Sequence, residues 1–333
     1  MINSNTPLVS ICIPLYDGEE YLRESLDSIV SQSYPHFEVI IVDDGSTDGS
    51  LKIVEEYSML DQRLKVFRNE QNLGLVGNWN KCISLTAGEW IKFQFQDDIM
   101  EKDAIEKMIR SALEWNVHLV LSDRKYIECG RNGTLKKYNR IKRLYHFVGE
   151  SRKVNPKEMS EIACVDHIEY NFLGEPIVGL MHRDVIKQYG IFDDLFSQLV
   201  DMEYWLRIST NETIGFLSDT LHTFRIHHNS QSTKNNKVQG LRPGLIDRVM
   251  LLEKIGDHPA YTTFRENAFQ SNDILMTEWI NTGLSKIICK VGYFNYRNTL
   301  GRKRIPKMLK RSPPKMLTAL STDLSKTIER LFS

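Results

Sequence analysis

The chain has 333 residues, of which 41% are hydrophobic and 26% charged, and equal numbers of acidic and basic side chains give it a formal net charge of zero. Such a composition is typical of a soluble globular protein long enough for two domains, and its neutrality gives no reason to expect a nucleic-acid partner. The cysteines are scattered without a CxxC pair, which favours reduced thiols over a disulfide framework or a zinc site. We expect no signal peptide and no membrane-spanning helix, because no apolar run approaches the required roughly twenty residues.

Apolar runs alternate with segments of helical periodicity in the first third of the chain. We expect strands over 8–14, 37–42 and 64–67 and from residue 90, and helices over 19–32, after 49 and over 79–86. This β-α-β-α-β-α-β order predicts an α/β fold with a parallel sheet and right-handed crossovers. A further strand is expected over 117–121.

The later part of the chain gives weaker signals. Residues 122–156 are polar and basic, and no element can be assigned to them. Short strands are expected over 177–181, 214–217 and 223–226, and helices over 184–189, 201–208 and 241–283. The polar run 229–236 is the candidate linker, which divides a domain of residues 1–235 from a mostly helical region of residues 236–333.

Two adjacent carboxylates, Asp97 and Asp98, follow the strand that begins at Trp90, and a helical pattern begins directly after them. They therefore lie at the sheet edge where open α/β folds bind ligands. Paired carboxylates there suit Mg2+ or Mn2+ that also carries a phosphate ligand, because these cations prefer hard oxygen donors. The alternative is that Asp98 only caps the following helix, and the pair alone does not decide between the two.

A second acidic turn, Asp43-Asp44-Gly45-Ser46, follows the second expected strand. Asp44 could accept a hydrogen bond from a nucleotide base or ribose, and glycine allows a sharp backbone turn. The alternative is a turn and helix cap without a ligand. There is no GxGxxG after the first strand and no GxxxxGK[ST] anywhere, so the dinucleotide fingerprint and the P-loop are both absent.

Several segments, in the same order along residues 8–230, resemble the family-2 glycosyltransferases of GT-A fold. The matching segments are 9–17 (VSICIPLYD), 28–34 (SIVSQSY), 42–49 (VDDGSTDG), 72–74 (NLG) followed by Asn80, 87–91 (AGEWI), 96–98 (QDD), 190–193 (GIFD), 201–207 (DMEYWLR) and 225–232 (RIHHNSQS). The resemblance implies a Rossmann-like domain that transfers a sugar from a nucleotide diphosphate donor to a hydroxyl acceptor.

The resemblance also implies roles for individual residues. Those expected at the donor are Pro14, Tyr16 and Glu19 around the base, Asp44 on the base imide, Asn80, Asp97 at the ribose or diphosphate, and Arg225 at a phosphate. Asp98 and His227 are expected to hold Mn2+ or Mg2+, and Asp201 to be the general base, with Glu203 as its competitor and a helix cap as its alternative role. Residues 174–176 are either acceptor contacts or a turn.

Two positions depart from the family pattern. The first acid of its metal-binding motif is replaced by Phe95 or Gln96, and the glutamate expected before Asp201 is Val200. The first departure leaves metal binding in place, because the last aspartate of the motif is the usual ligand. The second leaves the base but removes a neighbour that would have tuned it.

The expected function is an inverting, metal-dependent transfer of a hexose or N-acetylhexosamine from a UDP-sugar to a glycan or lipid-linked acceptor of a surface polysaccharide. One alternative is a non-catalytic protein of the same fold that binds nucleotide sugars or glycans, against which the intact Asp98 and Asp201 argue. A nucleotidyltransferase would carry a glycine-rich, basic phosphate loop after the first strand, and residues 14–18 do not form one.

The segment 286–315 carries ten basic and no acidic residues, with apolar side chains between them. Each basic residue near an anionic leaflet contributes about 1 kcal/mol to membrane binding. We therefore predict a cytoplasmic protein that attaches peripherally to the cytoplasmic face of the inner membrane. The alternative is a solvated basic face, or one paired with acidic residues elsewhere in the chain.

Overall fold

A computed structural model describes residues 6–130, 135–166, 168, 170–230, 243–270 and 274–284, apart from the side chains of Lys137 and Asp166. The strands are β1 (Val9–Leu15), β2 (Phe37–Asp43), β3 (Leu64–Arg68), β4 (Trp90–Phe93), β5 (Ile99–Met100), β6 (Leu119–Glu128), β7 (Arg152–Val154), β8 (Gly179–His182) and β9 (Ile214–Ile226). The helices are α1 (Glu19–Val30), α2 (Ser50–Leu60), α3 (Gly74–Ser84), α4 (Ala104–Trp115), α5 (Leu135–Tyr138), α6 (Tyr145–Val148), α7 (Pro156–Asp166), α8 (Arg183–Tyr189), α9 (Val200–Ser209), α11 (Pro243–Asp257) and α12 (Thr262–Phe269). Two 3-10 turns are η1 (Pro176–Val178) and η2 (Pro259–Tyr261).

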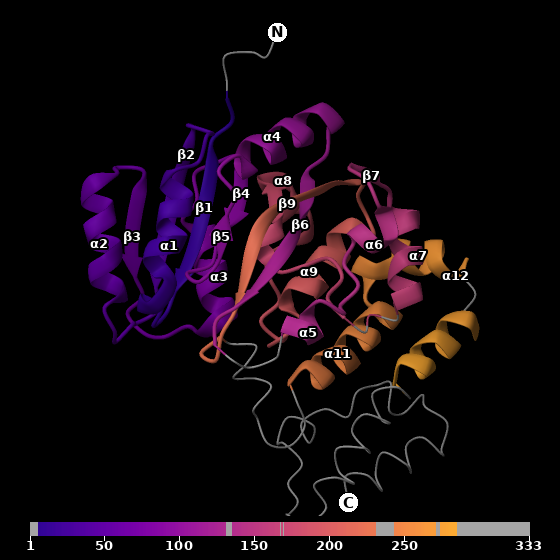
Figure 1. The fold of residues 1–333 in the computed structure, drawn as a ribbon. Coiled ribbons are helices and arrows are strands. Elements are labelled where there is room, and N and C mark those ends of the chain that lie inside the picture. Colours follow the sequence, from indigo (N-terminus) through magenta and orange to yellow (C-terminus); the bar gives the residue numbers. More distant parts are fainter. Residues whose placement is uncertain are drawn as a thin grey trace, which may run out of the picture.

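These strands form one sheet in the order β3-β2-β1-β4-β8-β6-β9-β5, and β7 pairs with β9 (Figure 1). The first four strands of the chain are parallel, as the alternation of strands and helices predicts. β8 runs antiparallel to β4 and β6, so the sheet is mixed rather than wholly parallel. Because β1, β2 and β4 are parallel neighbours, the loops that leave their carboxyl ends meet at one edge.

Helices cover both faces of the sheet. On β1, Ile11 and Ile13 pack with α1, α2 and α4, whereas Cys12 lies in a second cluster with α3, α9 and the later helices. All three side chains are fully buried. This burial on both faces explains why β1 reads as a continuous apolar run rather than as an alternating one.

The largest differences from the expected elements follow Asp98. The helix expected there begins only at Ala104, because β5 intervenes and pairs antiparallel with β9. The strand expected over 177–181 is divided between η1 and β8, and the strands expected over 214–217 and 223–226 are one strand, β9. Part of the segment 122–156, to which no element could be assigned, extends β6 to Glu128.

The helical region expected near the end of the chain is present as α11, η2, α12 and a further helical stretch over 274–284. Leu251, Phe264 and Trp279 from this region share one apolar cluster with Tyr204 and Trp205 of α9. The boundary expected at 235 and the basic segment 286–315 lie outside the described residues. Within the described ranges, no helix has the length and apolar character needed to cross a membrane.

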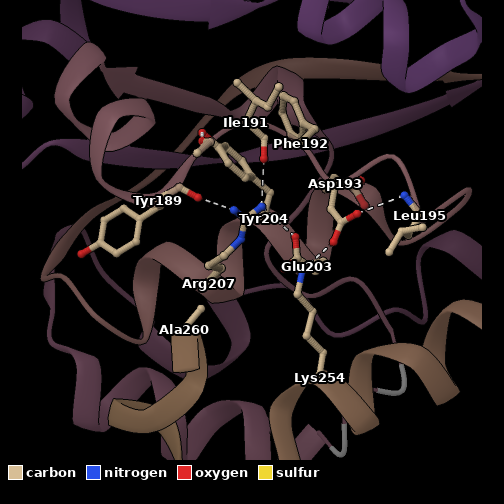
Figure 2. Close-up of polar contacts among 12 residues, drawn as sticks. Tyr189, Ile191, Phe192, Asp193, Leu195, Glu203, Tyr204, Arg207, Lys254 and Ala260 are labelled. Atoms are coloured by element: carbon tan, nitrogen blue, oxygen red, sulfur yellow. Dashed lines mark hydrogen bonds and ion pairs between the residues drawn. The ribbon is translucent and has the colours of Figure 1, made fainter. Parts of the chain in front are cut away.

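A buried ion network fastens this helical region to α9 (Figure 2). Glu203 is fully buried, and its carboxylate accepts from Lys254 Nζ at 2.7 Å and from Arg207 Nη2 at 2.9 Å. Lys254 also donates to Asp193 at 2.6 Å, and Arg207 donates to the carbonyl of Ile191 at 3.0 Å. The network therefore joins α11, α9 and the loop before α9 at one point.

We predict that Lys254→Met lowers the free energy of unfolding by about 3–5 kcal/mol, because the fully buried Glu203 and the partly exposed Asp193 then lose the cation between them. Lys187→Met is the matched control, since Lys187 Nζ also lies 2.6 Å from a carboxylate, that of Asp184, but this pair is exposed. Urea denaturation of both variants, followed by circular dichroism, measures the difference. Equal, small losses of stability in the two variants would contradict the role given to the buried network.

Candidate functional site

A cleft of about 860 Å³ opens where the loops after β1, β2 and β4 meet. This is the edge at which open α/β sheets bind ligands. The expected site residues that line it are Pro14, Tyr16, Glu19, Asp44, Asp97, Asp201 and His227. Asp98, Arg225 and Asn80 are not part of the lining.

Gln96 holds the loop that presents Tyr16, whose side chain is half exposed. The Gln96 amide accepts from the Tyr16 N–H at 2.9 Å and donates to the Tyr16 carbonyl at 3.0 Å. A carboxylate cannot make the second of these bonds, since it has no donor when ionised. Sequence reasoning treated Gln96 only as a departure from the family motif, and the structure gives it a function in shaping the cleft. Gly18 provides the space for the Gln96 side chain, because a Cβ at this position would lie 2.5 Å from it.

Asp44 lines the cleft and also anchors the chain between β3 and α3. Its buried carboxylate accepts from the N–H groups of Leu73 at 2.8 Å and Gly74 at 3.0 Å and from Asn69 Nδ2 at 2.8 Å. Oδ2 accepts only the Gly74 bond among these three, so it retains lone-pair capacity for a ligand. Glu19, at the start of α1, similarly accepts from the Gly49 N–H at 2.8 Å.

Asp98 has the features of a metal ligand. It is 1% exposed, and Oδ1 accepts from the Arg225 N–H at 2.8 Å, while the buried Oδ2 has no hydrogen-bond partner among the described residues. Burial and then the charge of Asp97 raise the pKa of Asp98 well above its ordinary value. The N-cap of α4 is Asp103, so the interpretation of Asp98 as a mere helix cap is wrong.

Asp97 and His227 both line the cleft and pair with each other there. Asp97 Oδ2 lies 2.7 Å from His227 Nε2, although the two residues are 130 positions apart. The unpartnered Asp98 oxygen and this carboxylate–imidazole pair provide the oxygen and nitrogen donors that Mn2+ accepts, and Mg2+ accepts the oxygens. The types of donor therefore suit the expected divalent cation, although these three residues are not among the described groups whose donor atoms all lie within 4.8 Å of one another.

Arg225 and Asn80 are committed to other contacts. Arg225 Nε donates to the Asp97 carbonyl at 2.7 Å, its Nη2 lies 2.5 Å from Glu24, and its guanidinium stacks over Tyr21. It thus ties the acidic turn to α1 from behind the cleft wall. Both ends of the Asn80 amide bond to the backbone of Phe192, at 2.9 and 3.1 Å, and this joins α3 to the loop after α8.

The structure distinguishes the two candidate bases. Asp201 lies in the first turn of α9 and lines the cleft, whereas Glu203 is enclosed in the ion network of Figure 2. Asp201 Oδ1 accepts from the Met202 N–H and Oδ2 from Asn171 Nδ2, both at 2.8 Å. Burial and then the charge of Glu175 raise the pKa of Asp201 to about 8. Sequence reasoning missed Asn171, which belongs to no motif.

A second cluster with metal-ligand chemistry lies at the opposite edge of the sheet, where His118, His182 and Asp184 come together. Its members already have partners in the fold. His182 Nδ1 accepts from the Asp184 N–H at 3.2 Å, and Lys187 Nζ lies 2.6 Å from the Asp184 carboxylate. This cluster is separate from the expected metal residues of the cleft.

Comparisons with known proteins agree with this geometry. The family model described as glycosyl transferase family 2 matches residues 10–167. An uncharacterized glycosyltransferase of Haemophilus influenzae is 30% identical over 262 residues, which are 76% of this chain and 76% of that protein. The putative teichuronic acid biosynthesis glycosyltransferase TuaG of Bacillus subtilis is 38% identical over 108 residues, 32% of this chain and 43% of that protein. The chain belongs to glycosyl transferase family 2 and is a glycosyltransferase.

Solved structures show the same fold at low sequence identity. TarS 1–349 of S. aureus in complex with UDP-GlcNAc gives a TM-score of 0.60 at 20% identity, over 83% of this chain and 71% of that one. The mannosyltransferase PcManGT of Pyrobaculum calidifontis, in complex with GDP-Man and Mn2+, gives a TM-score of 0.56 at 15% identity. The match covers 98% of this chain and 84% of that one. The expected GT-A fold is confirmed.

We predict that Gln96→Glu weakens binding of the nucleotide-sugar donor roughly tenfold or more. The variant loses the bond to the Tyr16 carbonyl and adds a charge to an acidic cleft, together worth about 1–3 kcal/mol. Isothermal titration calorimetry measures the affinity. Gln188→Glu adds the same charge at an exposed position outside the cleft and serves as the control. An unchanged affinity in Gln96→Glu would show that the Tyr16 loop does not depend on this amide.

Proposed function

We propose that this glycosyltransferase is inverting and requires a divalent cation. Its donor is a UDP-hexose or UDP-N-acetylhexosamine, and its acceptor is a hydroxyl of a glycan or lipid-linked glycan precursor. In this proposal Pro14, Tyr16, Glu19 and Asp44 surround the nucleotide base, and Asp97 lies by the ribose or diphosphate. The charge of the cleft is the observation that carries the proposal.

The cleft is lined by acids. Its carboxylates are Asp17, Glu19, Glu20, Asp44, Asp48, Asp97, Glu175 and Asp201. Among the described residues that line it, none is lysine or arginine, and the histidine is His227. A nucleotide diphosphate adds more negative charge, and like charges at short range oppose binding in a partly desolvated site. A bound cation removes this conflict, because it is then the largest local charge.

Asp98 Oδ2, Asp97 and His227 are the residues that would hold Mn2+ or Mg2+. When bound, the ion stabilises the negative charge that develops on the leaving diphosphate. The Mn2+ bound by the mannosyltransferase of the same fold supports this choice of metal. Arg225 contributes from behind, because its backbone N–H and guanidinium keep the Asp97–Asp98 turn in place.

Asp201 takes the proton of the acceptor hydroxyl. As the hydroxyl oxygen bonds to the anomeric carbon, the bond from that carbon to the diphosphate oxygen breaks, and the nucleotide leaves with the electron pair. Attack opposite the leaving group inverts the anomeric configuration. One positioned base is typically worth about 100- to 10,000-fold in rate. The raised pKa makes the ionised Asp201 a stronger base than an exposed aspartate.

The relatives support the choice of donor and acceptor. TarS binds UDP-GlcNAc, and the name of TuaG places it in teichuronic acid biosynthesis, which favours a UDP-sugar and a surface-polysaccharide acceptor. GDP-mannose is the second candidate donor, because the mannosyltransferase of the same fold binds it. The ten basic residues of 286–315 support peripheral attachment to the cytoplasmic face of a membrane, where a lipid-linked acceptor would lie.

We predict that one nucleotide sugar of a panel of UDP-sugars and GDP-mannose raises the melting temperature with Mn2+ and not with EDTA. The isosteric Asp98→Asn removes the charge and one oxygen ligand, so it should abolish this shift and nucleotide release while the fold survives. Differential scanning fluorimetry and chromatography of released nucleotide measure the two effects. Full activity in EDTA would refute the metal requirement. Donor binding without any release of nucleotide, with glycan acceptors supplied, would favour a non-catalytic binding protein.

We predict that Asp201→Asn lowers turnover about 100-fold or more and leaves nucleotide affinity nearly unchanged. Because the base acts when ionised and its pKa is raised to about 8, wild-type turnover should rise with pH up to about 8 and then level off. Glu203→Gln is the matched control, and it should cost stability but keep turnover per folded molecule. Normal turnover in Asp201→Asn together with loss in Glu203→Gln would show that the base is the other carboxylate.

A further inference from the structure

We propose that the loop 171–175 aims the Asp201 carboxylate at the acceptor, and that Asn171 is the positioning residue through which it acts. The inference rests on the proposed role of Asp201 as the base. Residues 171–175 match none of the family segments, and the sequence predicts only a turn or acceptor contacts at 174–176.

The Asn171 amide can present only one orientation to Asp201. Its Oδ1 accepts from the Gly174 N–H at 2.9 Å, which fixes the oxygen toward the loop. Its Nδ2 must therefore face Asp201, and it donates to Asp201 Oδ2 at 2.8 Å. Because Met202 N–H donates to Oδ1 at 2.8 Å, both oxygens of the carboxylate are held and its rotation is restricted. Oδ2 keeps a second lone pair for the acceptor hydroxyl.

Arg124 of β6 holds this loop from inside the protein. The residue is 1% exposed, its Nη2 donates to the Asn171 carbonyl at 3.3 Å, and its Nε lies 2.6 Å from Glu175. Gly174 makes this approach possible, because it has a φ of +108° and a Cβ there would lie 2.9 Å from the Arg124 guanidinium. The loop backbone is therefore set by a buried cation on a central strand of the sheet.

Two hydrogen bonds join the loop to α9, and their residues on the helix lie one helical turn apart. Trp205 Nε1 donates to the Gly174 carbonyl at 3.1 Å, and Trp205 follows Asp201 by four residues, which places both on the same face of α9. The bonds Asp201–Asn171 and Trp205–Gly174 thus fix both the distance and the rotation of the helix relative to the loop. A positioning function needs this kind of rigid support.

The charges around Asp201 give the loop a second effect. Glu175 in the loop raises the pKa of Asp201, and Arg124 on β6 lowers it. The Asn171 N–H stabilises the ionised carboxylate, because a hydrogen bond to the charged form favours that form. Loss of Asn171 therefore both frees the carboxylate and makes it harder to ionise.

The test is the pH–rate profile of donor turnover in Asn171→Ala. UDP-N-acetylglucosamine, UDP-glucose and GDP-mannose are supplied with Mn2+, and the release of nucleotide is measured as the sugar is transferred to water. The rate of this hydrolysis depends on the base, because the attacking water must also lose a proton. We expect turnover to fall tenfold or more, the acid limb of the profile to move to higher pH, and the Kd for UDP to stay within twofold. The isosteric Asn171→Asp should move the acid limb further, because a second carboxylate opposes ionisation of the first.

Asn211→Ala is the matched control. Asn211 lies just after α9 and donates to two carbonyls, those of Arg207 and Ala260, both at 2.8 Å, but it does not line the cleft. This variant should lose melting temperature as Asn171→Ala does and keep the wild-type pH profile. If Asn171→Ala fails to fold, the pH profile of the isosteric Asn171→Asp decides.

The outcomes separate this inference from the proposed function. A wild-type turnover and pH profile in the Asn171 variants, with Asp201→Asn inactive, would overturn the positioning function and leave the base in place. Normal turnover in Asp201→Asn would overturn the base itself, and the positioning function with it. Identical shifts of the pH profile in Asn171→Ala and Asn211→Ala would reduce Asn171 to a structural residue.

Discussion

Eight carboxylates gather in one cleft, and the contacts around the cleft follow from the need to stabilise them. Carboxylates that face each other in a partly buried space repel, and each must be stabilised by donors or cations. Most donors here come from the backbone of the cleft loops, such as Gly74 to Asp44 and Gly49 to Glu19. The arginines, by contrast, lie behind the wall, with Arg225 at the Asp97–Asp98 turn and Arg124 beneath Glu175. The cleft itself is left acidic, and this acidity is the basis of the proposal that a cation binds there together with an anionic donor.

The helix α9 connects this cleft to the rest of the protein. Every residue from Val200 to Ser209 is buried, so the helix is packed on all sides. Asp201 at its start faces the cleft, whereas Glu203, two positions on, points into the ion network with Lys254. Neighbouring residues of a helix point in different directions, so one short acidic segment supplies both a candidate base and an anchor for the helical region. The loss of stability in Lys254→Met would therefore affect the helix that carries the candidate base.

The sequence predicted the scaffold well where local pattern decides the structure. The strands β1 to β4 and the helices between them follow from apolar runs and helical periodicity, and the acidic turns at their ends predicted the cleft. Local pattern failed at the two-residue strand β5, where the pairing of Ile99 with Thr223 decides the structure and leaves no periodic signal. It also divided β9, which long-range pairing with β6 makes one continuous strand. The contacts of Arg225 and Asn80 could not be predicted for the same reason. Their hydrogen-bond partners are backbone groups far away in the sequence, which a family motif does not reveal.

Val200 stands where the family pattern has a glutamate, so the charges around the candidate base Asp201 come from other parts of the chain. Val200 is buried and lines the cleft without a charge. The carboxylate that acts most strongly on Asp201 is instead Glu175, which precedes it by 26 positions, and Arg124 on β6 opposes that effect. Because electrostatic interaction depends on distance and burial rather than on adjacency in sequence, a loop held by a buried cation can set the pKa of the candidate base in place of a neighbour in the motif. Asp201 thus keeps a charged neighbour although the motif lacks its glutamate.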